Sequence, residues 1–174
     1  GVGAYDLASE AARRSPEWED GIGRILKADI PAQAERALAP WLGAVRAMNP
    51  DGLGVYPGSP ALAASLMRAD DRAQLCELHR EDARALDQRF ARDKRVKVEI
   101  RDGYTALGDM LPPREKRGLV LVDPPFEHKD EMAHMAEAAV TAISRWTAGT
   151  FIFWRPLKDL WAQERFDAGL AGWL

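Results

Sequence analysis

The stretch that decides the fold is Leu119-Val120-Leu121-Val122-Asp123-Pro124-Pro125-Phe126, four apolar residues followed by an acid, two prolines and an aromatic ring. A short apolar run of this kind is typical of a buried strand in a parallel sheet. In open α/β sheets, ligands bind beyond the carboxyl ends of the strands. We therefore predict a strand over Leu119–Asp123, with the Asp123 carboxylate at a ligand site.

The residues after this strand suit the binding of a planar exocyclic amine. Such a nitrogen is a poor nucleophile because its lone pair is delocalised into the ring, so the protein has to accept its two N–H groups. The Asp123 carboxylate and the Pro124 carbonyl supply acceptors, and the restricted φ of Pro124 and Pro125 stiffens that backbone. Phe126 offers a ring on which an extruded base can stack. These four residues are the candidate catalytic set; the structural alternative is a strand-ending Asp, a Pro-Pro turn and a core Phe.

Further short apolar runs alternate with amphipathic stretches. We predict strands over Gln74–Leu78, Val96–Ile100 and Thr150–Trp154, and helices over Glu81–Arg92, Tyr104–Leu111, Glu131–Trp146 and Lys158–Leu170. In the third of these helices Met132, Met135, Ala139 and Ile143 share one face at helical spacing. Strands that alternate with helices indicate an α/β domain with at least four parallel strands.

Residues 8–55 differ from the rest, because Ala, Glu, Arg and Leu dominate and prolines recur at intervals that suit short helices. We predict a helical subdomain here, closed by a turn at Asn49-Pro50-Asp51-Gly52. Ser59 is placed to cap a following helix that runs to about Arg68. The six tryptophans sit in apolar contexts, which favours packing over base stacking for each of them.

The composition restricts the class of protein. With 174 residues, 47% hydrophobic and 29% charged, the chain suits one compact domain and excludes disorder over its whole length. A net charge of −3 does not by itself indicate a nucleic-acid partner, although Arg89–Arg101 is locally basic. The single Cys76 and the scattered histidines lack metal-ligand spacing, so no metal is predicted.

The termini of the sequence and its hydropathy further restrict the class of protein. No apolar run reaches the roughly 18 residues of a membrane span, and the start lacks the features of a signal peptide, so we expect a cytoplasmic protein with no membrane partner. Because the chain begins on Gly1 and ends on Leu174 directly after an expected helix, we expect it to be a piece of a longer protein.

Several motifs, in order, resemble one known family. Asp123-Pro124-Pro125-Phe126 is similar to the fourth motif of amino-group methyltransferases, and Gly1-Val2-Gly3 to the end of their glycine-rich first motif. Between and beside them stand Tyr56-Pro57-Gly58-Ser59-Pro60, Glu77-Leu78-His79, Asp102-Gly103 and Arg117-Gly118, and the whole order resembles the ribosomal RNA large-subunit methyltransferase J family. The resemblance covers nearly the whole chain and is most specific from Tyr56 to Phe126.

This resemblance implies a single domain over 1–174 with a Rossmann-like class I methyltransferase sheet, truncated at both the N- and C-terminal sides, and residues 8–55 as an inserted helical subdomain. It also implies that S-adenosylmethionine is the cosubstrate, held by Gly1, Gly3, Ser59, Glu77, Asp102, Gly103 and Asp123. Glu77 would accept the ribose hydroxyls, Asp102 the adenine amino group, and the Ser59 hydroxyl would bind the methionine portion. Phe126 stands where many members have tyrosine, so stacking is kept and a hydroxyl is lost.

The function that follows is methylation of the N6 amino group of an adenine in large-subunit (23S) ribosomal RNA by a monomer that binds this RNA. The same chemistry on another amine stays open: adenine in DNA, cytosine N4 or a glutamine side chain. A different class also stays open, because members of this family have been labelled as proteins for using external DNA. In that case the chain would be a nucleic-acid-binding protein without catalysis.

Overall fold

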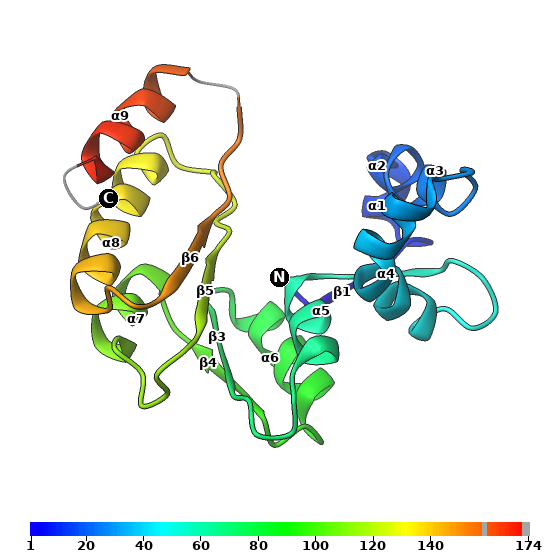
Figure 1. Ribbon diagram of the computed structural model, residues 1–174, viewed down its shortest axis with the longest axis horizontal. Coiled ribbons are helices and arrows are strands. Elements are labelled where there is room, and N and C mark those ends of the chain that lie inside the picture. The colour runs from blue at the N-terminus through cyan, green and yellow to red at the C-terminus, as the bar shows by residue number, and fades with distance from the viewer. Residues whose placement is uncertain (158–159, 172–174) are drawn as a thin grey trace. The chain divides into compact units, whose positions relative to one another are not determined.

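The computed structural model describes residues 1–157 and 160–171, and the chain divides into two compact units, Gly1–Ile100 and Arg101–Leu174 (Figure 1). The first unit holds β1 (Ala4–Asp6), α1 (Glu10–Arg14), α2 (Glu17–Asp20), α3 (Ile22–Ile25), α4 (Ala32–Ala47), β2 (Val55–Pro57), α5 (Ser59–Leu66), β3 (Ala73–Glu77), α6 (Arg80–Phe90) and β4 (Val96–Ile100). The second holds α7 (Gly103–Met110), β5 (Leu119–Val122), α8 (Glu131–Arg145), β6 (Thr150–Phe153) and α9 (Leu160–Leu170). Helices and short two-stranded sheets of both directions make a mixed α/β fold.

Helices α1 to α4 occupy the segment between β1 and β2. Ile22, Leu42 and Val45 are buried in a small apolar core there, and Trp18 and Trp41 pack against it. This core is separate from those of the second unit. Burial of apolar area against neighbouring helices is what holds helices as short as α2 and α3, since isolated helices of one turn are unstable in water.

One side chain ties the end of α4 to β2. The Asn49 amide nitrogen donates to the carbonyls of Val45 and Val55, and its oxygen accepts from the N–H groups of Gly54 and Val55, all at 2.8 Å. The turn predicted at this asparagine is therefore present. The amide thus bonds four backbone groups and fixes the path of the chain from α4 to β2.

Strands β3 and β4 form a parallel pair in the first unit, with Ala73 opposite Val96 and Glu77 opposite Ile100. Helix α6 connects them and packs through Ala83 and Leu86, which are 1% and 2% exposed. A strand, a crossover helix and a parallel strand make one βαβ unit. Glu77 is the last residue of β3 and lies at the carboxyl end of this strand pair.

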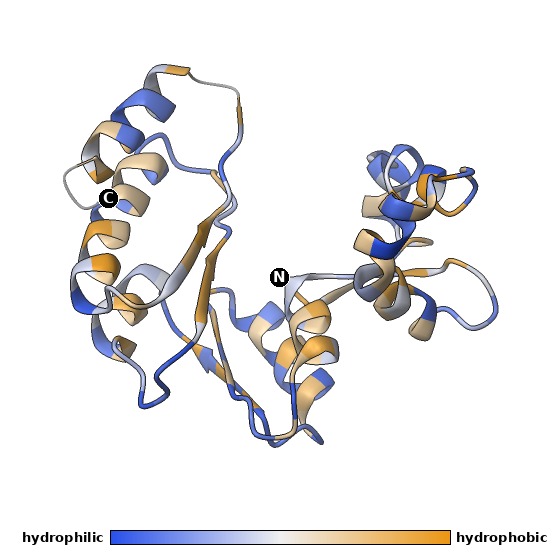
Figure 2. Ribbon diagram, viewed as in Figure 1, coloured by the Kyte–Doolittle hydropathy of each residue, from blue (hydrophilic) through white to orange (hydrophobic). Residues whose placement is uncertain are grey.

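Strands β5 and β6 form a second parallel pair, in the other unit, and α8 connects them. Val120, Val122, Phe151 and Phe153 pack toward cores built on α8, whose residues Met135 and Ala139 are completely buried. The predicted face of α8 is thus confirmed. Figure 2 shows both strands as strongly apolar.

Two glycines let the ends of this strand pair approach a tryptophan. A Cβ added at Gly118 or Gly149 would lie 2.8 or 2.5 Å from the nearest atom of the Trp146 ring, closer than carbon atoms approach one another. Trp146 itself is 8% exposed and packs with Leu111 and Ala142. The glycines therefore serve the packing of this ring.

The predicted strands and helices of the two parallel pairs are confirmed to within two residues at each described end, and positions 158–159 of the last predicted helix lie outside the described residues. Three expectations are corrected. Strands β1 and β2 were not expected. Gly58, not Ser59, occupies the N-cap of α5, and no side chain caps it; that helix ends at Leu66.

The third correction concerns the tryptophans. Trp154 and Trp161 are 53% and 77% exposed, so the expectation that every tryptophan packs inside is wrong for these two; Trp173 lies outside the described residues. The apolar neighbours of Trp154 in the sequence are strand residues that alternate between a packed and an exposed side, and Trp154 follows on the exposed side.

Candidate functional site

The carboxylate of Glu77 lies at the end of β3 and is 17% exposed. Its Oε1 accepts the N–H of His79 at 2.8 Å, and its Oε2 accepts the terminal ammonium of Gly1. Burial opposes ionisation of this group, but the bonds from Gly1 and His79 outweigh it and lower the pKa of Glu77. The structure thus brings together two of the predicted cofactor residues, Gly1 and Glu77.

Gly3 and the start of α5 are also in contact in this unit. The carbonyl of Gly3 accepts the N–H of Gly58 at 3.0 Å, directly before Ser59. Gly3 has φ 80°, and a Cβ there would lie 2.8 Å from Leu86 Cδ2 on α6. The positive φ favours glycine at this position, and the close approach to Leu86 adds to that preference, so Gly3 serves backbone geometry and packing.

Asp102 caps the N-terminus of α7. Its Oδ2 accepts the N–H of Thr105 at 3.0 Å and the hydroxyl of Thr105 at 2.5 Å, and its Oδ1 accepts the N–H of Tyr104 at 3.3 Å. Burial acts against the charge, while these bonds lower the pKa of Asp102. Next to it, a Cβ added at Gly103 would meet nothing within 4 Å, so the backbone is open to approach there.

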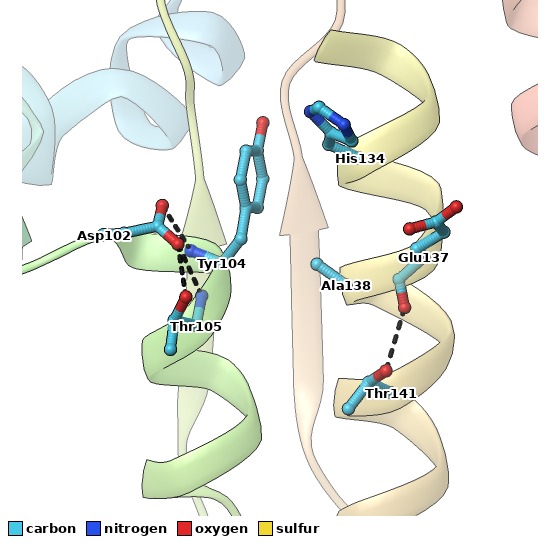
Figure 3. Close-up of a pocket in the computed structure, with 7 residues that line it drawn as sticks. All are labelled: Asp102, Tyr104, Thr105, His134, Glu137, Ala138 and Thr141. Carbon is cyan, nitrogen blue, oxygen red and sulfur yellow. Dashed lines mark hydrogen bonds between the residues drawn. The ribbon is translucent and has the colours of Figure 1, made fainter. Parts of the chain in front are cut away.

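A depression of about 430 Å³ lies between α7 and α8 in the second unit. Asp102, Tyr104 and Thr105 line it from α7, and His134, Glu137, Ala138 and Thr141 line it from α8, at the spacing of one helix face (Figure 3). Sequence reasoning missed this depression, because it depends on how two helices pack.

The Tyr104 hydroxyl makes a partly buried link between the same helices. It donates to Oε1 of Glu131 at 2.8 Å, and Glu131 is only 8% exposed at the first residue of α8. Burial and the bond to Glu131 raise the pKa of Tyr104 above its ordinary value. This hydrogen bond joins the first turn of α7 to the start of α8, directly after the segment between β5 and α8 that contains Asp123.

Asp123 directly follows β5 and is exposed. No residue of the described part of the chain forms a hydrogen bond or an ion pair with its carboxylate. Pro124 is half-buried and Pro125 is exposed. A carboxylate at a strand end, with all its lone pairs available and a proline-stiffened backbone behind it, can accept N–H donors from a ligand.

Phe126 is half-buried and has φ 53°. A non-glycine residue in this region is uncommon, and the strain of about 1–3 kcal/mol persists only where surrounding contacts hold it. The Phe126 ring packs against the core around Met135 and lies 5.9 Å from the Trp154 ring, at 52° between ring planes. Sequence reasoning did not pair these two rings.

Three of the six basic residues of Arg89–Arg101 bind groups within the protein: Arg95, Lys97 and Arg101. Arg95 donates to the carbonyls of Ala64 and Met67 at 3.0 and 2.7 Å and to the Asp93 carboxylate at 2.7 and 2.9 Å. The hydrogen bonds that Arg95 donates to Asp93 lower the pKa of Asp93 to about 2. Lys97 pairs with Glu99 at 2.6 Å, and Arg101 pairs with Asp109. Local basic composition therefore does not translate into an equal number of phosphate-binding groups.

Among the described residues, no group of three or more His, Cys, Asp or Glu side chains is placed to hold a metal ion. Within the same residues, no helix combines the length and apolar character needed to cross a bilayer. His128 lies exposed in the segment after Phe126.

Parallel strands that end in carboxylates define a mixed α/β protein with candidate binding groups at its strand ends. The model of the family described as "Ribosomal RNA large subunit methyltransferase D, RlmJ" matches residues 1–172. The chain belongs to this family, which confirms the resemblance found in the sequence.

Individual proteins agree with this placement. The chain is 38% identical over 173 residues to a protein of Haemophilus influenzae named ribosomal RNA large subunit methyltransferase J, covering 98% of this chain and 60% of that protein. It is 38% identical over 159 residues to the Escherichia coli protein of the same name, covering 90% of this chain and 55% of that one. A crystal structure of a Legionella pneumophila protein is similar with a TM-score of 0.89 at 30% identity, covering all of this chain and 63% of that one. The chain thus spans little more than half the length of these curated relatives.

Proposed function

We propose that this chain is part of an S-adenosylmethionine-dependent methyltransferase that modifies the N6 amino group of an adenine in large-subunit ribosomal RNA. Membership of the family and the names of the two curated relatives support the reaction and the RNA. The single observation that carries the proposal is the exposed Asp123 carboxylate, which has no partner in the described part of the chain and stands where β5 ends.

The residues present fit the cosubstrate to different degrees. Each oxygen of Glu77 accepts one hydrogen bond and keeps a lone pair, so the carboxylate can still accept two ribose hydroxyls. Gly103 leaves the backbone open, whereas Asp102 already accepts three donors and has one lone pair left on Oδ1. S-adenosylmethionine, when bound, would supply the methyl group. Gly1, Gly3 and Ser59 belong to the same proposed set.

Asp123 and Pro124 act on the amine in this proposal. The carboxylate and the carbonyl accept the two N–H groups, which turns the nitrogen toward the methyl donor and fixes the approach for an in-line transfer. With S-adenosylmethionine bound, the new N–C bond would form as the methyl carbon gives up its bond to sulfur. The nitrogen would then be acidic, and its proton would leave to the Asp123 carboxylate or afterwards to water. Pro125 keeps the turn rigid, and Phe126 stacks on the base.

The same proposal includes the architecture. Both parallel strand pairs have the strand, helix, parallel strand order from which a Rossmann-like sheet is built, and helices α1 to α4 fall within residues 8–55, the proposed insertion. A single domain over 1–174, a cytoplasmic location and a monomeric state remain predictions of the same kind.

The test is transfer of labelled methyl groups by the full-length protein. We expect methylation of 23S ribosomal RNA prepared from cells that lack the gene, and none of the same RNA from cells that carry it, since its target is already modified. Duplex DNA, offered as the second substrate, should stay unlabelled.

Other results would redirect the proposal. Labelling of DNA and not of RNA would assign the same chemistry to DNA adenine or cytosine. Absence of transfer together with absence of S-adenosylmethionine binding, measured by calorimetry, would favour a nucleic-acid-binding protein without catalysis and would refute the proposed function.

A further inference from the structure

Trp154 occupies the same place after β6 that Asp123 occupies after β5. The N–H of Trp154 donates to the carbonyl of Val122 at 3.0 Å, which extends the hydrogen bonding of the strand pair by one residue. In the register, Val122 is opposite Phe153, so the next pair in line is Asp123 and Trp154. Residues opposite each other on adjacent strands are close neighbours.

The alternation of exposure places both side chains on one side of the strand pair. Leu119 and Leu121 are exposed on β5 and Ile152 is exposed on β6, and Asp123 and Trp154 continue these series at the next alternate positions. Trp154 is 53% exposed. Its ring is therefore not needed to fill the core that Val122 and Phe153 join on the other side.

The Trp154 and Phe126 rings meet at an angle. Their centroids are 5.9 Å apart and their planes are 52° from parallel, so no base can enter between them. Two tilted rings in contact form a corner instead. A planar ligand that stacks on one ring presents its edge to the other, an arrangement that aromatic groups favour. The core around Met135 holds the Phe126 side of this corner.

We propose that Trp154 is a base-binding residue, the second aromatic wall of the site in which Asp123 and Pro124 accept the amine. This inference rests on the proposed function and extends it to the substrate class: a purine with an accessible face, and hence an unpaired or extruded nucleotide. A base within a duplex stack has no free face to offer such a corner.

The experiment uses the full-length protein and 23S ribosomal RNA from cells that lack the gene. We compare Trp154→Ala, Trp154→Phe and Trp154→Leu with Trp161→Ala, a matched control because Trp161 is an exposed tryptophan on α9 of the same unit. Loss of one stacked base predicts a KM for RNA that rises on the order of 5- to 150-fold for Trp154→Ala. Trp154→Phe should recover most of the affinity, Trp154→Leu should not, and Trp161→Ala should behave as wild type.

The dissociation constant for S-adenosylmethionine and the unfolding temperature separate binding from a merely structural role, and both should stay unchanged in Trp154→Ala. An unchanged KM for RNA in that variant, while the wild type methylates RNA, would overturn this inference and leave the proposed function intact. Equal recovery by Leu and Phe would also overturn it, because an aromatic face would then not matter. Should Trp154→Ala not fold, the Leu and Phe variants decide. A wild type that does not methylate RNA would refute both proposals.

Discussion

Glu77 and Asp123 are carboxylates at the ends of parallel strands, one in each unit, and their surroundings are opposite. Glu77 is 17% exposed and accepts the N–H of His79. Asp123 is exposed and accepts none from the described residues. A carboxylate held by protein donors is oriented before any ligand arrives, whereas one with free lone pairs can take donors that come and go. The difference supports a binding role for Glu77 and an amine-orienting role for Asp123.

Asp123 should show the largest effect if this division is right. In the full-length protein, Asp123→Ala removes an acceptor aimed at the reacting amine, and we expect kcat for methyl transfer to fall on the order of 10²- to 10³-fold. Asp123→Asn keeps one carbonyl acceptor and should lose less. Single-turnover kinetics with saturating cosubstrate measures this step.

Glu127→Ala is the matched control, because Glu127 is an exposed acid in the same segment. It should retain wild-type kcat. Equal losses at Glu127 and Asp123 would mean that the charge of the segment matters and that the carboxylate of Asp123 has no particular role.

Glu77 should affect binding of the cosubstrate instead of the chemical step. Glu77→Ala removes hydrogen bonds between the cosubstrate and a charged acceptor. We therefore expect the dissociation constant for S-adenosylmethionine, measured by calorimetry, to rise roughly 10- to 100-fold. The kcat at saturation should change little. Glu81→Ala, an exposed acid in the first turn of α6, is the control. A Glu77 variant with wild-type affinity and reduced kcat would reverse the assigned roles.

Glu131 provides a third environment, a carboxylate buried against a tyrosine. Tyr104→Phe leaves that carboxylate without its 2.8 Å donor, and we expect the free energy of unfolding to fall by about 1–3 kcal/mol. Denaturant titration measures it. Thr141→Ala removes only an exposed bond from the side chain to the Glu137 carbonyl in the same depression and should cost less. Equal stability of Tyr104→Phe and wild type would show that the link between α7 and α8 contributes nothing.

Substitution of Asp102 should have the smallest effect on stability among these changes, because its carboxylate acts as a helix cap. Asp102→Ala should reduce the free energy of unfolding by about 1 kcal/mol at neutral pH. The folded pKa of Asp102 is lower than its ordinary 3.8, so the stabilisation is full above that value and is lost as the pH falls through the folded pKa. Unfolding temperatures of wild type and variant should therefore converge toward acid pH. A gap that widens on acidification would contradict this.

The sequence was most informative where local pattern and packing agree. The runs that became β5 and β6 were predictable because short continuous apolar runs are typical of strands, and the face of α8 with Met135 and Ala139 was predictable because burial on one side of a helix imposes a period. The position of Asp123 after its strand followed from the same pattern. The resemblance then supplied the family, which no periodicity could supply.

Other features depend on contacts distant in sequence. Strands β1 and β2 have three residues each, which is too short to show a periodic pattern. They also pair residues far apart in the sequence, such as Ala4 with Pro57. The contact of Gly1 with Glu77 and the 5.9 Å approach of Phe126 to Trp154 arise only when separate elements meet. Trp154 was taken for a packed residue because its neighbours are apolar, and the sequence does not say which side of an apolar strand is covered.

The most direct test of the central claim is mapping N6-methyladenine in 23S ribosomal RNA from cells that lack the gene, complemented with full-length wild type, Asp123→Ala or Glu127→Ala. We expect one adenine to be unmodified in the deletion strain, restored by the wild type and by Glu127→Ala, and absent with Asp123→Ala at equal protein levels. Restoration of that methyl group by Asp123→Ala would contradict the account.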